Sequence, residues 1–249
     1  MITEDDHLAA ELAAEAGRRL LDLRASGGDP DTLRHEGDLS SHEFLAAQLA
    51  RRRPDDAVLS EEGADNPARL RASRVWIVDP LDGTREFGEP GRTDWAVHVA
   101  LWERGELTAG AVALPGQGRV LSTADPSCGA PTSSSGTIRL VVSRTRPPEF
   151  VARLADKTGA ELMPLGSAGA KAAAVICGSA DAYVHSGGQY EWDSAAPVAV
   201  ALAAGLHASR IDGSKLSYNQ VPPSLPDILI CQAALADMLL GAISSVREE

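Results

Sequence analysis

The chain has 249 residues, of which 44% are hydrophobic, so it can bury a substantial core as one large domain or as two lobes that share an interface. Its net charge of -12 argues against nonspecific nucleic-acid binding, which needs a surplus of basic residues to neutralise phosphates. Aromatic residues make up only 4% of the sequence, which favours helices packed on sheets over an aromatic-rich β-sandwich.

Apolar residues at helical spacing predict two amphipathic helices at the start of the chain. The first runs from Glu4 to Arg24, with Thr3 as its N-cap. The second is expected to open at Ser40, because Ser40 and Glu43 have the spacing of a capping box, and to end before Pro54. Both helices would turn an apolar stripe towards a common core.

Short apolar runs then predict strands. The runs Ala57 to Leu59 and Val75 to Val78 each stop at carboxylates, as buried strands do when they deliver functional residues from their ends. Trp95 to Trp102 and Leu107 to Leu114 flank a short turn and predict an antiparallel hairpin. His98 lies within this hairpin and is interpreted as structural or incidental rather than catalytic.

A loop rich in Ser, Gly and Pro, from Thr123 to Gly136, is the predicted boundary between two lobes, residues 1–125 and 137–249, which would form one compact unit. Beyond it, strand-like and helix-like runs alternate, which is typical of α/β structure. The strand-like runs are Ile138 to Ser143, Asp181 to His185 and Asp227 to Cys231, and the helix-like runs lie near Glu149 to Lys157, Ala168 to Cys177 and Asp193 to Ala204.

The cysteines and the apolar runs bear on the location of the protein. Cys128, Cys177 and Cys231 are far apart and form no CxxC pair, so they indicate neither a disulfide framework nor a zinc site. The acidic N-terminal segment does not read as a signal peptide. The longest apolar run, about Ala195 to Ala208, is too short to span a bilayer. We therefore expect a cytoplasmic protein without a membrane partner.

Acidic residues gather at three points where one predicted element gives way to another. Glu61 and Glu62 follow the first short strand, Asp79 and Asp82 follow the second, and Asp193 precedes an Ala-rich helix. Each group alone is more often a helix cap or a solvated surface group. Together they predict a magnesium site, because magnesium prefers oxygen ligands and keeps several waters. Asp79 is placed to bridge two adjacent ions.

The turn around Asp82 would complete this site. Pro80 restrains the backbone between the two aspartates and could aim both side chains, with the carbonyl of Leu81, at one point. Gly83 and Thr84 then offer main-chain N–H groups to an anion if they open a helical turn. Bound cations would attract a phosphate group, and these amides would hold the oxygens that the cations leave free.

The acidic elements resemble those of the inositol-monophosphatase-like superfamily of magnesium-dependent, lithium-sensitive phosphatases. That superfamily pairs an EE element and a DPxDGT element with a downstream WD, which are here Glu61-Glu62, Asp79 to Thr84 and Trp192-Asp193, in the same order. The resemblance runs over nearly the whole chain. It implies the inositol monophosphatase and sugar phosphatase fold, a layered αβαβα sandwich of the α/β class.

The resemblance also implies a ligand set for two magnesium ions. Glu61 and Asp79 would ligate the first ion together with the Leu81 carbonyl. Asp79, Asp82 and Asp193 would ligate the second ion. A third ion stays open, because the residues before the upstream aspartate depart from the usual pattern.

A second implication concerns the attacking water. The superfamily uses an upstream aspartate that orients this water with the motif threonine. Asp38 falls at the matching distance before Glu61, so Asp38 and Thr84 are the candidates for water activation, with Glu61 as a further catalytic residue.

Within the superfamily the similarity is to the CysQ-type 3'-phosphoadenosine 5'-phosphate (PAP) phosphatases. It rests on DGTREF and on the segments from Gly166 to Lys171 and from Gly188 to Asp193. It implies hydrolysis of PAP to AMP and phosphate, with the related phosphosulfate PAPS as an open second substrate, in the service of sulfate assimilation.

A bisphosphate needs positive charge away from the metals, so Arg85 and Lys171 are candidates for its second phosphate. Asp82, Gly83, Thr84, Ser167 and Asp193 would complete the substrate site. The competing interpretations are a solvated helix face for Lys171 and a simple ion pair with Glu86 for Arg85.

Three alternatives stay open. The shared metal apparatus also suits an inositol monophosphatase or a fructose-1,6-bisphosphatase. The protein could instead be a noncatalytic homologue with a regulatory role, but the intact acidic elements disfavour this hypothesis. A homodimer through the apolar hairpin strands is also compatible with the sequence.

Overall fold

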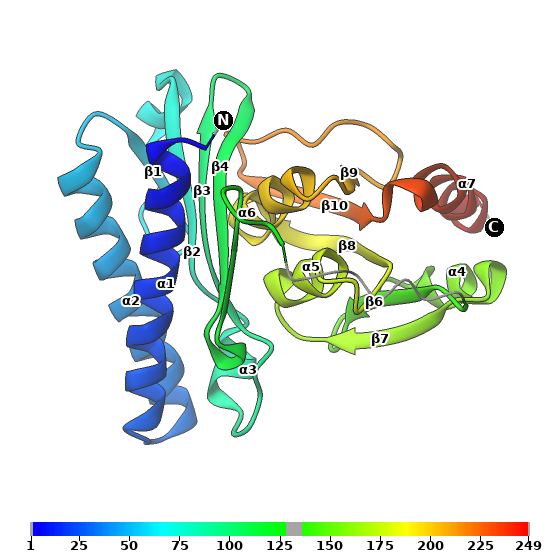
Figure 1. Cartoon of the computed structure of the whole chain (residues 1–249), viewed down its shortest axis with the longest axis horizontal. Helices are drawn as coiled ribbons and strands as arrows, with labels where there is room; N and C mark the ends of the chain where they lie inside the picture. Colours follow the sequence, from blue (N-terminus) through cyan, green and yellow to red (C-terminus); the bar gives the residue numbers. More distant parts are fainter. Residues whose placement is uncertain (1, 128–135, 249) are drawn as a thin grey trace.

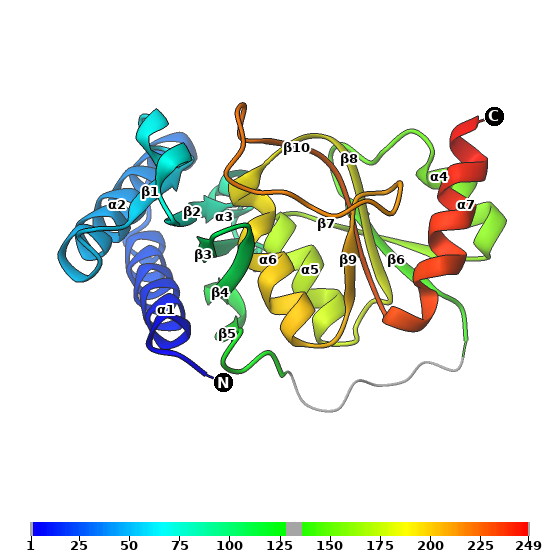
Figure 2. The same cartoon turned by 90° about the horizontal axis from the view of Figure 1, so that it is seen from above.

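The structure, a computed structural model, describes residues 2–127 and 136–248 of the chain. In this part of the chain, helix pairs and sheets alternate in five layers, seen edge-on in Figure 1 and from above in Figure 2. An outer helix pair covers the first sheet, a second pair lies between the two sheets, and a third covers the far face of the second sheet. The predicted α/β class and αβαβα sandwich are confirmed.

The outer helix pair begins as helix-capping rules require, although one start differs from the prediction. Helix α1 (Glu4–Ala25) is capped by Thr3, whose hydroxyl accepts a hydrogen bond from the backbone of Asp6 in a capping box. Helix α2 (Pro30–Arg52) ends before Pro54 as predicted, but its predicted start at Ser40 is wrong.

The true start of α2 lies at Asp29, which accepts hydrogen bonds from the amides of Asp31 and Thr32. Pro30 occupies the first helical turn, where its missing N–H is not needed. The hydroxyl of Ser40 instead contacts the Gly37 carbonyl inside the helix, so the capping-box spacing was a coincidence of sequence.

The first sheet has the strand order β1-β2-β3-β4-β5, and it is antiparallel except for the parallel pair β1 and β2. Its strands are β1 (Ala57–Ser60), β2 (Arg74–Asp82), β3 (Ala96–Glu103), β4 (Glu106–Leu114) and β5 (Arg119–Ser122). The predicted hairpin is confirmed, and its tip Arg104-Gly105 has the positive φ angles of a tight hairpin turn. Strand β2 continues to Asp82, beyond the predicted end at Val78.

The second sheet is mixed, with the order β7-β6-β8-β10-β9. Its strands are β6 (Arg139–Ser143), β7 (Glu161–Leu165), β8 (Ala182–Tyr190), β9 (His207–Ser209) and β10 (Ser224–Cys231). The predicted strands correspond to β6, β8 and β10, whereas β7 and β9 were not predicted. Residues 128–135 of the predicted boundary loop lie outside the described residues, and the division into two lobes stays a prediction.

The remaining helices form the middle and outer layers. They are α3 (Thr84–Gly88), α4 (Val151–Thr158), α5 (Ala168–Ile176), α6 (Glu191–Ala203) and α7 (Ala236–Glu248), with short 3-10 helices at Pro67–Arg71, Pro115–Gln117 and Ala233–Leu235. The predicted helices match α4, α5 and α6. Helices α5 and α6 pack between the sheets, and their first residues lie near the end of β2.

Close packing fixes α6 on the first sheet. A Cβ atom on Gly110 of β4 would lie 2.6 Å from the Cβ of Ala199, so the strand and the helix approach each other too closely for a larger residue.

The cysteines and the apolar helices bear on two further predictions. Cys231 is a buried free thiol, whereas Cys177 is disulfide-bonded, which the cysteine spacing did not indicate. Among the described helices, none combines the length and the apolar character that crossing a bilayer requires.

Candidate metal centre

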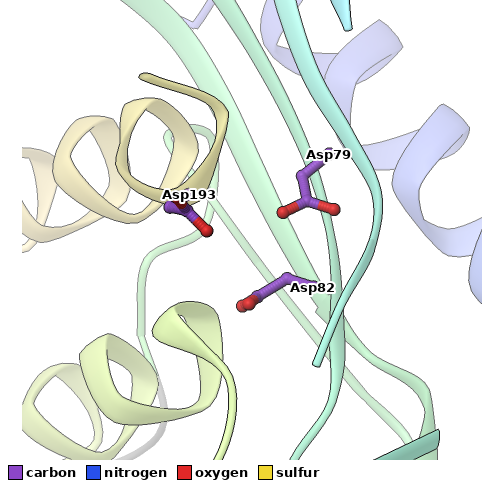
Figure 3. Close-up of side chains that lie close together, drawn as sticks. All are labelled: Asp79, Asp82 and Asp193. Carbon is purple, nitrogen blue, oxygen red and sulfur yellow. The ribbon is translucent and has the colours of Figure 1, made fainter. Parts of the chain in front are cut away.

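Three aspartates from distant parts of the chain meet at the end of β2. Asp79, Asp82 and Asp193 each offer one carboxylate oxygen, and these oxygens lie within 4.8 Å of one another (Figure 3). Residues three apart on a regular strand point to opposite faces. Here the register between β2 and β3 shifts between Asp79 and Asp82, which allows both side chains to face the start of α6.

Asp79 and Asp193 carry unfavourable charge in the absence of a cation. Burial and the negative charges of Glu61, Asp82 and Asp193 raise the pKa of Asp79 well above its ordinary value. Burial and repulsion from Asp82 raise the pKa of Asp193 to about 6, although the Tyr190 amide donates a hydrogen bond of 2.6 Å to its carboxylate. The same hydrogen bond caps α6, so Asp193 has a structural role as well as a place in the cluster.

Asp82 differs from its neighbours because donors surround it. Its carboxylate accepts hydrogen bonds from the Ser167 hydroxyl at 2.5 Å and from the amides of Ala168 and Gly169 at 3.0 and 2.6 Å. His98 adds an ion pair of 3.1 Å. Burial acts to raise the pKa of Asp82, but the charge of His98 and these hydrogen bonds outweigh it and lower the pKa below its ordinary value. Asp82 is therefore a fixed, ionised anchor.

Glu61 lies at the rim of the same cleft and is exposed to solvent. Desolvation and the charges of Asp193, Asp82 and Asp38 raise its pKa to about 7, although a hydrogen bond with Asp79 acts in the opposite direction. Its carboxylate is not part of the three-aspartate group. The structure thus places Glu61 in the lining of the same cleft as the three aspartates.

The predicted water-activating pair is brought together. The Thr84 hydroxyl lies 3.2 Å from an oxygen of Asp38 and 3.1 Å from the Leu81 carbonyl. Burial and the charge of Glu62 raise the pKa of Asp38 to about 6. Gly83 makes this geometry accessible, because its φ of 87° is one that other residues rarely adopt.

The aspartates lie in a cleft of about 360 Å³ that both sheets and α5 line. Lys171 lines it but is buried, and its ammonium group donates to the carbonyls of Gly166 and Ser167 at 3.0 and 2.6 Å. The alternative of a solvated helix face is therefore wrong.

Arg85 also lines the cleft and is exposed, as a second-phosphate residue would be. The alternative in which Glu86 holds Arg85 is wrong, because Glu86 pairs with Arg144 at 2.6 Å. Ser143, Thr145, Arg146, His185 and Gln189 form the rest of the far wall. Arg146 was not predicted, because the sequence has no local signal that β6 ends opposite the aspartates.

The residues present fit a divalent cation. The donors are carboxylate oxygens and the Leu81 carbonyl, which hard cations such as magnesium prefer to nitrogen or sulfur ligands. Burial raises the pKa values of Asp79, Asp193 and Glu61, and repulsion between neighbouring carboxylates adds to this effect, so the cleft holds an excess of negative charge. A cation would neutralise this excess.

The fold and the acidic cleft define a class of protein, and the chain belongs to the inositol monophosphatase family, whose model matches residues 6–248. The chain is 55% identical over 239 residues to a 3'-phosphoadenosine 5'-phosphate phosphatase of Mycobacterium bovis, covering 92% of this chain and 90% of that one. It is 52% identical over 255 residues to the phosphatase of the same name from Mycobacterium leprae, with coverages of 97% and 94%.

A solved structure, CysQ from Bacteroides thetaiotaomicron, superposes with a TM-score of 0.76 at 25% identity, covering 91% of this chain and 96% of that chain. The resemblance to CysQ-type phosphatases within the inositol monophosphatase family is thus confirmed.

Proposed function

We propose that this protein is a magnesium-dependent phosphomonoesterase that hydrolyses the 3'-phosphate of PAP to give AMP and phosphate. The observation that carries the proposal is the convergence of Asp79, Asp82 and Asp193 in a cleft that is also lined by Thr84, whose hydroxyl contacts Asp38. The names of the mycobacterial relatives support PAP as the substrate.

Two magnesium ions fit the proposal, with Glu61, Asp79 and the Leu81 carbonyl for one and Asp79, Asp82 and Asp193 for the other. Bound magnesium supplies Lewis-acid charge that lowers the pKa of a water and stabilises negative charge on the leaving ribose oxygen. The number of ions belongs to the proposal.

In this proposal, the side chains of Thr84 and Asp38 orient the attacking water and accept its proton. The Thr84 hydroxyl donates its single hydrogen to Asp38 or to the Leu81 carbonyl, so its lone pairs can accept a hydrogen bond from a water. The Asp38 carboxylate, with a pKa of about 6, can accept a proton from that water near neutral pH. No covalent intermediate with the protein is required.

The second phosphate of the substrate needs a cationic wall away from the aspartates. Arg85 and Lys171 line the cleft, and Arg146 lies on its far wall. The guanidinium groups are suited to binding phosphate through paired hydrogen bonds. The hydroxyl of Ser167 is bonded to Asp82, so Ser167 contributes by holding this metal ligand rather than by free donation.

The test is phosphate release from PAP, inositol 1-phosphate and fructose 1,6-bisphosphate by the purified protein, with magnesium and with excess chelator. The proposal predicts magnesium-dependent release with PAP as the best substrate, and inhibition by lithium. A preference for either sugar phosphate would favour the alternative enzymes. Absence of release from all three with bound magnesium would favour the noncatalytic reading.

Arg85→Ala would separate the roles of the two phosphates. It should raise KM for PAP and leave the reaction of 3'-AMP, which lacks the second phosphate, near the wild-type level. The proposal also includes a cytoplasmic location, a link to sulfate assimilation and a homodimer. Localisation experiments test the first, and hydrodynamic measurements test the last.

A further inference from the structure

His98 is a fully buried histidine that contacts every element of the aspartate cluster. It lies on β3, directly opposite Asp79 in the register with β2. Its Nε2 atom is 3.1 Å from a carboxylate oxygen of Asp82, and its Nδ1 atom is 3.0 Å from the Trp192 carbonyl and 4.0 Å from Asp79. One side chain thus joins the end of β2 to the first turn of α6.

The third element to contact His98 is α5. A Cβ atom on Gly169 would lie 2.2 Å from the Nε2 atom, so the first turn of this helix packs directly on the imidazole. The amide of Gly169 also donates to Asp82. The imidazole is therefore packed against the end of β2 and the first turns of α5 and α6.

The two ring nitrogens of His98 lie against oxygens on two different elements. The Nδ1 atom faces the Trp192 carbonyl and the Nε2 atom faces the Asp82 carboxylate. The planar imidazole spans the distance between these partners, which the shorter side chain of asparagine cannot do. The residue following Trp192 is Asp193, so the brace acts on two ligands of the cluster.

We propose that His98 is a positioning residue that fixes Asp82 and the start of α6 relative to each other, so that Asp79, Asp82 and Asp193 are arranged for a divalent cation before it binds. The inference rests on the proposed function. It is consistent with the interpretation of His98 as structural rather than catalytic, and assigns it the part of a group that supports metal ligands without contacting the ion.

The experiment is calorimetric titration of the substrate-free protein with Mg²⁺, and separately with Mn²⁺, so that no turnover enters the readout. His98→Asn should weaken cation binding by roughly 10-fold to 100-fold, the usual cost of losing a group that orients metal ligands. The matched control is His207→Asn, which removes a histidine on β9 that contacts Ser209 at 2.8 Å, and should bind within about twofold of wild type.

A second variant leaves the imidazole in the chain and displaces it. Gly169→Ala should drive His98 from Asp82 and weaken cation binding, whereas Gly17→Ala creates a comparable clash of 2.5 Å between α1 and Pro115, away from the aspartates, and should leave the affinity unchanged. Should His98→Asn fail to fold, Gly169→Ala carries the test alone.

Wild-type affinity in folded His98→Asn, even with a lowered unfolding temperature, would show a merely structural role and overturn the inference. Wild-type affinity in Gly169→Ala would do the same. If the wild-type protein bound no cation in this titration, the proposed function itself would fail, and this outcome is distinct from the others.

Discussion

Asp79→Asn should stabilise the cation-free protein while abolishing its response to magnesium. Asp79 is 1% exposed, and its Oδ1 atom accepts a hydrogen bond of 3.0 Å from the Leu81 amide, which an asparagine oxygen can retain. Its other oxygen faces the carboxylates of Asp82 and Asp193. The substitution replaces a repelled anion there by an amide that can donate.

The size of the stabilisation follows from the distances between the carboxylates. Two unit charges 4.8 Å apart repel by about 3.5 kcal/mol at an effective dielectric constant of about 20, and Asp79 has more than one such neighbour. The destabilisation that this repulsion causes has an upper limit, because Asp79 can bind a proton instead, and protonating a carboxyl of pKa 3.8 at pH 7 takes about 4 kcal/mol. We therefore expect the variant to gain roughly 2–4 kcal/mol in the free energy of unfolding.

Urea unfolding at pH 7 with and without magnesium measures both effects. Magnesium should raise the unfolding midpoint of the wild type and leave that of Asp79→Asn unchanged, because a cation stabilises only the state that binds it. A variant that is less stable than the cation-free wild type would refute the electrostatic reasoning. A variant that magnesium stabilises as it does the wild type would refute the ligand assignment.

Three further predictions follow from the described contacts. Lowering the pH from 7 to 5 should increase the urea midpoint of the cation-free protein, because Glu61, with a pKa of about 7, and Asp193, with a pKa of about 6, bind protons in the folded state that an unfolded chain has released. Saturating magnesium should remove this gain in stability. A urea midpoint that decreases as the pH is lowered from 7 to 5 would contradict the prediction. Thr84→Val should lower kcat about 100-fold with unchanged cation affinity in calorimetry, while Thr84→Ser keeps the hydroxyl and most of the rate, so equal rates in both variants would exclude a role for the hydroxyl. Arg69→Met should cost about 3 kcal/mol in urea unfolding, because it strands the buried Asn219 oxygen that Arg69 contacts at 2.7 Å, and a loss under 1 kcal/mol would show that the contact contributes little.

The parts of the fold that sequence could predict are those with local causes. Thr3 and the apolar spacing after it define α1, and the short turn between two apolar runs defines the hairpin of β3 and β4. The start of α2 was misplaced because Ser40 and Glu43 imitate a cap, whereas Asp29 and Pro30 form the real one. The local sequence alone does not show which of these two capping patterns starts the helix, because the choice depends on the packing around them.

Three elements that were not predicted, two strands and a helix, have different explanations. Strand β7 is exposed along much of its length and contains Pro164, so it lacks the apolar run by which buried strands are identified. Strand β9 is only three residues long. Helix α7 did carry a usable signal, since Leu239, Ile243 and Val246 follow helical spacing and are buried.

In the candidate site, the acidic residues could be predicted because their motifs are contiguous in sequence. The contact between Asp38 and Thr84 was also predicted, through the family resemblance. The places of His98 and Arg146 could not be predicted, because they depend on how β3 and β6 lie against α5 and α6 in space. A single histidine or arginine has no sequence context that separates such a role from a solvated side chain.

Crystals of the protein soaked in Mn²⁺ would test the central claim most directly, because anomalous scattering locates this ion without reference to activity. The account predicts an anomalous peak coordinated by carboxylate oxygens of Asp79, Asp82 and Asp193. Ordered Mn²⁺ elsewhere, with these three side chains free of it at saturating concentration, would contradict it.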